Sequence, residues 1–179
     1  MDVVAHRLFF AFRIAAGVRD VVAGCRDGLG PATGTVSDDR LHMTLAITND
    51  YPQLPIAAVD RMLSIGSSLA ESPVPLCLDR LSGGRGSVAL RPARRIKALA
   101  QLTGTLNRRM TAAGLLRSMW RCHPHVTLLY RKGQAFTRAV DPICWTATDF
   151  VLIHSIVGAH RHIELGRWPL IERQGSFDF

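Results

Sequence analysis

Hydrophobic residues follow two rhythms along the chain, and each rhythm predicts a different kind of element. Short apolar runs rich in β-branched and aromatic side chains are typical of buried strands. Longer segments in which apolar residues recur every three or four positions are typical of helices with one buried face. The predicted strands are 7–14, 41–48, 74–81, 87–91, 125–130, 150–157 and 160–165. The predicted helices are 15–29, 55–71 and 92–113.

The segments between these elements carry the glycine, proline and polar residues of turns and loops. A polar loop is expected at 33–40, a hairpin turn at 82–86 and an irregular stretch around Asp141-Pro142. This order of elements predicts an α+β fold with mainly antiparallel sheets. No segment rich in proline, glycine or serine is long enough to link independent domains, so we expect one domain over residues 1–179.

The composition favours a polyanionic partner. There are 22 basic against 14 acidic side chains, a net charge of +8 with histidine neutral, and a hydrophobic share of 47% excludes a disordered chain. All the basic residues except Lys97 and Lys132 are arginine, whose planar guanidinium binds phosphate through two hydrogen bonds. RNA is such a partner. A genome of high G+C content also favours arginine, so this signal is weak by itself.

The distribution of apolar residues and cysteines indicates a cytoplasmic protein. No apolar run approaches the roughly 18 residues of a membrane span, and the amino terminus lacks the layout of a signal peptide. Cys25, Cys77, Cys122 and Cys144 are widely spaced and show no zinc-binding pattern. We expect them to be small core residues in a reducing compartment, and we expect neither a disulfide scaffold nor a bound metal.

One pattern, His-x-Thr-Leu, occurs twice. The copies begin at His42 and His125, 83 residues apart, and each lies in a predicted strand. Residues two apart in a strand project from the same face, so His42 points with Thr44 and His125 with Thr127. A single copy is more often an ordinary polar strand face. Two copies in strands half a chain apart predict that both pairs line one cleft.

Two imidazoles and two hydroxyls suit phosphoryl chemistry. A histidine titrates near neutral pH, so one imidazole can accept a proton while the other donates one. Threonine hydroxyls can donate hydrogen bonds to the phosphate oxygens on which charge accumulates. This chemistry needs no metal, cofactor or nucleoside triphosphate.

With these residues, the whole chain resembles the two-histidine (2H) phosphoesterases, most closely their bacterial LigT-like group of 2′-5′ RNA ligases and RNA 2′,3′-cyclic phosphodiesterases. The resemblance implies a bilobal fold of two pseudosymmetric antiparallel-sheet lobes, with helices outside and a central cleft. It implies catalysis by His42 and His125 and phosphate binding by Thr44 and Thr127. Some members carry an arginine five residues after the second histidine.

At that position this chain has Tyr130, followed by Arg131, and we take both as candidate phosphate-binding residues. The implied activity hydrolyses a 2′,3′-cyclic phosphate end of RNA to a 2′-phosphate, with His125 as base and His42 as acid. An RNA 5′-hydroxyl in place of water would give ATP-independent 2′-5′ ligation. The alternatives are an esterase acting on small cyclic or 2′-5′-linked nucleotides, and a non-catalytic RNA-binding module. We expect a monomer.

Other polar and aromatic residues have a structural interpretation beside a functional one. Phe10 and Phe12 share a strand face and are candidates for stacking on a base, although a core position is the commoner role. His160 and His162 are expected in an exposed hairpin, with a contribution to RNA binding as the alternative. Basic residues open the third helix and are expected on a solvated face, with phosphate contact as the alternative; they are Arg91, Arg94, Arg95 and Lys97.

Overall fold

The structure is a computed structural model, and it describes residues 5–171. In that range three α-helices and nine strands alternate along the chain, with a short 3-10 helix η1 at Asp38–Arg40. The helices are α1 (Ala16–Asp27), α2 (Ile56–Ser67) and α3 (Lys97–Ala112). The strands are β1 (Ala5–Arg13), β2 (Gly34–Thr35), β3 (His42–Ile47), β4 (Val74–Gly83), β5 (Ser87–Arg91), β6 (Val126–Tyr130), β7 (Phe136–Ala147), β8 (Asp149–Val157) and β9 (Arg161–Pro169).

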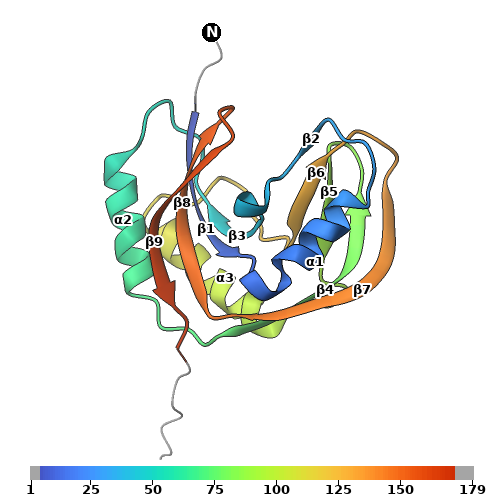
Figure 1. Cartoon of the computed structure of the whole chain (residues 1–179). Helices are drawn as coiled ribbons and strands as arrows, with labels where there is room; N and C mark the ends of the chain where they lie inside the picture. Colours follow the sequence, from blue (N-terminus) through green and yellow to red (C-terminus); the bar gives the residue numbers. More distant parts are fainter. Residues whose placement is uncertain (1–4, 172–179) are drawn as a thin grey trace, which may run out of the picture.

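The strands form one antiparallel sheet made of two similar halves. Its order is β7-β4-β5-β6-β3-β1-β8-β9, with β2 paired to β6. β6 and β3 meet at the centre through a single residue pair, Met43 with Val126. Because so little pairing joins them, the halves separate into two lobes, which Figure 1 shows to the left and right of the centre. The predicted bilobal α+β architecture is confirmed.

The helices cover one face of the sheet, and the main hydrophobic core lies beneath them. α1 packs on the β6–β7 half, α2 on β8 and β9, and α3 against β3 and β4 (Figure 1). Alternate residues of the central strands, such as Met43 and Val126, point into this core and are fully buried. Their neighbours in the chain therefore face the opposite side, which no α-helix of the described chain covers.

The sequence prediction missed β7. Pro142 and the polar residues around it indicated an irregular stretch, yet residues 136–147 form a long strand paired with β4. β7 lies at the edge of the sheet, where a proline without an N–H removes no ladder hydrogen bond from a second neighbour. The register also shifts next to Pro142, between Leu78 and Arg80 of β4, which is the kind of bulge that accommodates proline.

Two of the cysteines also differ from expectation. Cys77 of β4 and Cys144 of β7 are directly opposite in the sheet and form a disulfide, whereas Cys25 and Cys122 are free. The spacing along the chain gave no hint of this pair, because the prediction contained no strand at residue 144. Within residues 5–171, no helix combines the length and the apolar character needed to cross a membrane.

Candidate functional site

The uncovered face of the sheet is hollowed where the two lobes meet. A cavity of about 390 Å³ lies there, and both copies of the repeated motif line it. His42 and Thr44 reach it from β3, and His125 and Thr127 from the start of β6. All four side chains are half-buried. The structure thus brings together the four residues that the repeat singled out.

The sheet register relates the two motifs by an approximate twofold axis. The axis passes through the Met43–Val126 pair, which is the midpoint of both motifs. Because antiparallel strands run in opposite directions, each motif's histidine lies across from the other motif's threonine. A ligand on this axis would meet an imidazole and a hydroxyl from each side.

Each histidine ring makes the same kind of hydrogen bond, to the backbone carbonyl oxygen two residues before it. Nδ1 of His42 lies 2.6 Å from the carbonyl oxygen of Arg40, and Nδ1 of His125 lies 2.6 Å from that of His123. A carbonyl oxygen only accepts, so Nδ1 carries the proton and donates it in both cases. Each neutral ring therefore keeps its lone pair on Nε2, where it can accept a proton from a ligand.

Burial in the cavity wall makes both histidines less basic. It lowers the pKa of His42 from 6.5 to about 4, helped by the charges of Arg13 and His125 and opposed by the hydrogen bond to Arg40. Burial also lowers the pKa of His125, and the charge of Arg91 adds to the effect. Both imidazoles are consequently mainly neutral at pH 7. A bound anion would raise both pKa values, because it stabilises the charged form.

A third histidine, His162, completes the site, at a position that its sequence context did not predict. His162 was expected in an exposed hairpin, but it lines the cavity and makes an edge-to-face contact with His42, at a centroid distance of 5.2 Å. Burial lowers the pKa of His162 to about 3, with His42 and Arg40 contributing. The sequence did not reveal that β9, which carries His162, belongs to the same half of the sheet as β3, which carries His42. In that half the order is β3-β1-β8-β9. His160 also lines the cavity and is exposed, as expected.

Of the three phenylalanines of β1, Phe9 lines the site, and the two that were predicted to do so do not. Phe10 and Phe12 are 0% exposed and lie in the main core under the helices, so the prediction that they stack on a base is wrong. Phe9 points the other way, lines the cavity and stacks on His42 at a centroid distance of 4.9 Å. Because side chains alternate along β1, Phe9 faces the side opposite to Phe10 and Phe12. Trp120 packs against the small cluster that contains Phe9.

Of the two residues proposed to replace the family's arginine, Tyr130 reaches the cavity and Arg131 does not. Tyr130 is 45% exposed at the end of β6. Arg131 points elsewhere, because its guanidinium donates a 2.7 Å hydrogen bond to the carbonyl of Leu29 and lines a different cavity. The interpretation of Arg131 as a phosphate ligand is therefore wrong. The two neighbouring side chains therefore lie at different cavities.

Arg40 supplies a cation that no motif of the sequence indicated. It lines the cavity two residues before His42, and its buried Nε has no hydrogen-bond partner in the described chain. Burial is the main cause of the lowered pKa values of His42 and His162, and the charge of Arg40 adds to both shifts. The other lining arginine, Arg7, is already bound through two 2.6 Å hydrogen bonds to Asp50.

The cavity is therefore built for an anion. Among the described residues, its lining includes two arginines and four histidines but no aspartate or glutamate. Within residues 5–171, no three histidine, cysteine or acidic side chains are grouped in a way that could hold a metal ion. The arrangement offers hydrogen-bond donors, the guanidinium of Arg40 and two proton-transfer groups on opposite sides of a ligand.

Comparison with known proteins gives a consistent result. The model of the 2′-5′ RNA ligase superfamily matches residues 14–158. A protein of Escherichia coli K12 named RNA 2′,3′-cyclic phosphodiesterase is 30% identical over 176 residues, which is 93% of this chain and 98% of that protein. The crystal structure of E. coli LigT complexed with 3′-AMP is 26% identical and superposes with a TM-score of 0.75, covering 94% of this chain and 99% of that one. A crystal structure from Thermus thermophilus shares the fold at 19% identity, with a TM-score of 0.71 over 92% of this chain and 97% of that one.

Proposed function

The chain belongs to the 2′-5′ RNA ligase superfamily, and from this premise we propose that it hydrolyses RNA ends bearing a 2′,3′-cyclic phosphate to leave a 2′-phosphate. The name of the E. coli relative supports this substrate class. The observation that carries the proposal is the matched pair of histidines. His42 and His125 line one cavity, and each has Nδ1 committed to a backbone carbonyl and Nε2 left for a ligand.

In the proposed reaction the two histidines act on opposite sides of the phosphorus. Nε2 of neutral His125 accepts a proton from water as the water oxygen attacks phosphorus in line with the ribose 3′ oxygen. The new P–O bond forms while the P–O3′ bond breaks, and protonated His42 gives its Nε2 proton to the departing 3′ oxygen. The product has a free 3′-hydroxyl and a 2′-phosphate. His125 ends protonated and His42 neutral, so the pair must exchange one proton with solvent before the next turnover.

The remaining polar groups stabilise the charge on phosphorus. The hydroxyls of Thr44 and Thr127 donate hydrogen bonds to the non-bridging oxygens, and the guanidinium of Arg40 neutralises the growing charge. Phe9 stacks on His42 and fixes the plane of the ring. These roles need no nucleoside triphosphate.

The same geometry would serve ligation if an RNA 5′-hydroxyl replaced water as the nucleophile. The family name supports that second activity. We favour hydrolysis because water has free access, whereas ligation requires a second strand to be held in position.

The proposal is tested with short RNAs that end in a 2′,3′-cyclic phosphate, a 2′-phosphate or a 3′-phosphate. We expect only the cyclic end to react, and we expect it to yield the 2′-phosphate. Hydrolysis restricted to small cyclic or 2′-5′-linked nucleotides would support the small-nucleotide esterase instead. Binding of all RNAs without turnover would support the non-catalytic module.

The pH dependence of the reaction follows from the lowered histidine pKa values. The active form has one imidazole protonated and one neutral, and its share is highest between the two pKa values of the free protein. Because burial lowers both pKa values below 6.5, kcat/KM should be maximal below about pH 6.5 and should fall toward tenfold per pH unit above it.

The kcat profile should lie at higher pH than the kcat/KM profile, because the bound phosphate raises the histidine pKa values. Both profiles are measured on one cyclic-phosphate RNA at constant ionic strength. A kcat/KM maximum above neutral pH would contradict the assignment of the two buried histidines as acid and base.

Chelation should leave the activity intact. Two imidazoles supply both proton transfers and Arg40 supplies the positive charge, so we expect the rate in excess EDTA to equal the untreated rate. The measurement uses protein dialysed against EDTA, followed by addition of Mg²⁺, Mn²⁺ or Zn²⁺. Loss of turnover in EDTA that a divalent ion restores would overturn the proposed mechanism.

A further inference from the structure

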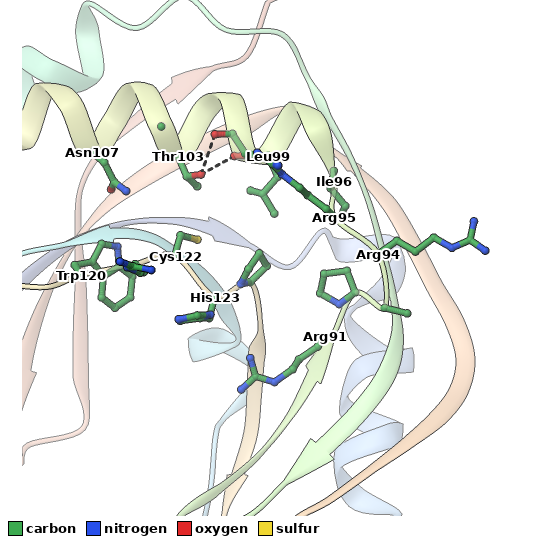
Figure 2. Close-up of a pocket in the computed structure, with 16 residues that line it drawn as sticks. Arg91, Arg94, Arg95, Ile96, Leu99, Thr103, Asn107, Trp120, Cys122 and His123 are labelled. Carbon is green, nitrogen blue, oxygen red and sulfur yellow. Dashed lines mark hydrogen bonds between the residues drawn. The ribbon is translucent and has the colours of Figure 1, made fainter.

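A second cavity adjoins the catalytic one. It has a volume of about 630 Å³ and lies between α3 and the segment 120–124 that leads into β6 (Figure 2). Trp120 lines both cavities. The chain then passes along the second cavity through His123 and enters the catalytic one at His125. The two cavities are thus neighbours, and the segment 120–125 forms the wall between them.

The second cavity is strongly cationic. Of the described residues, four arginines and one histidine line it, and no aspartate or glutamate does; these basic residues are Arg91, Arg94, Arg95, Arg121 and His123. The side chain of Arg94 extends outward, away from the other labelled residues (Figure 2). No ion pair within residues 5–171 involves any of the four arginines. The charges of Arg91 and His123 also act on the catalytic His125. Phosphate groups held on this cluster would lie beside the reacting phosphate.

The inner wall of the second cavity has the character of a base-binding surface. Apolar side chains from α3 and its approach, including Ile96 and Leu99, line one side, and the proline rings Pro92 and Pro124 also contribute. Asn107 and Trp120, two residues of this wall, also carry buried polar atoms that have no partner in the described chain: the acceptor Oδ1 and the donor Nε1. A nucleobase presents an apolar face together with donors and acceptors on its edge.

We propose that this cavity binds the nucleotide preceding the cyclic-phosphate end, with its base against α3 and its phosphate on the arginine cluster. The inference rests on the proposed function and narrows the substrate to RNA of two or more nucleotides. A cyclic mononucleotide fills only the catalytic cavity. A dinucleotide also occupies the second one, so it gains charge-assisted hydrogen bonds and base contacts.

The test measures Kd for two ligands that need no turnover, a nucleoside 2′-phosphate and a dinucleotide ending in a 2′-phosphate. We expect the wild-type protein to bind the dinucleotide at least about tenfold more tightly than the mononucleotide. In Arg95→Ala/Arg121→Ala, that advantage should shrink about tenfold, while mononucleotide binding stays unchanged. Both arginines are exposed, so their loss leaves the core intact.

The control variant is Arg85→Ala/Arg108→Ala, which removes the same charge from exposed positions outside both cavities. It should keep the full preference for the dinucleotide. Equal wild-type affinity for the two ligands, or equal loss in both double variants, would overturn the inference. Because binding is measured, failure of the second cavity is distinguishable from failure of the proposed hydrolysis, which the RNA panel tests separately.

Discussion

Replacing either His42 or His125 with alanine should lower kcat on a cyclic-phosphate RNA end by roughly 10²–10⁴, the usual contribution of a general acid or base. Each ring loses the Nε2 that transfers a proton, and water does not replace it at a fixed position. Both side chains are half-buried on the face opposite the main core. Their loss should therefore change the unfolding temperature little, which thermal unfolding of each variant checks.

A substrate with a better leaving group separates the two histidines. A nitrophenolate departs without a proton, so a general acid contributes little to the cleavage of an activated aryl phosphodiester. With His42 as acid, His42→Ala should recover most of its lost rate on that substrate, whereas His125→Ala should stay slow. Recovery by His125→Ala alone would reverse the two roles. Recovery by neither variant would mean that both histidines mainly bind the phosphate.

The parts of the site that were predictable from the sequence are those carried by local periodicity. In β3 and β6, alternation places the histidine and threonine of each motif on one face and the apolar residues on the other. The helices pack only on the apolar face of these strands, so the face with the histidines and threonines stays open to a ligand. The repeat then connects two distant strands without any knowledge of the sheet order.

The parts that were not predictable depend on which strands pair. β1 is buried on both faces, so its sequence does not reveal that Phe9, rather than Phe10 and Phe12, faces the cavity. His162 reaches the site only because β9, β8, β1 and β3 are successive neighbours. The Cys77–Cys144 bond likewise depends on the pairing of β4 with an edge strand that contains a proline.

The arginine that the family resemblance implies also could not be located from the sequence, because its position depends on the three-dimensional arrangement. A fixed spacing from the second histidine pointed to Tyr130 and Arg131. Such a spacing does not say which side chains reach the cavity in three dimensions. The structure directs Arg131 to the carbonyl of Leu29, while Arg40, just before the site's first strand, brings its guanidinium to the cavity with Nε unpartnered in the described chain. A charge required at one point of a cavity can come from any element that borders it.

Arg40→Ala should accordingly lower kcat/KM by about 10²–10³, the size expected when one preorganised donor to the transition-state charge is removed. Arg40→Lys should recover part of the loss, because it restores the charge but not the two-pronged guanidinium. Arg131→Ala is the matched control, since it removes an arginine whose side chain points away from the cavity. It should leave kcat/KM unchanged.

The pH profile distinguishes an electrostatic role of Arg40 from a structural one. The charge of Arg40 lowers the pKa of His42, so its removal should raise that pKa and move the kcat/KM maximum of Arg40→Ala to higher pH. Arg40→Lys retains the charge and should keep the wild-type maximum. A lower rate with an unchanged profile in Arg40→Ala would mean that Arg40 only shapes the cavity wall. An equal loss in Arg131→Ala would assign the phosphate-binding role to Arg131 instead.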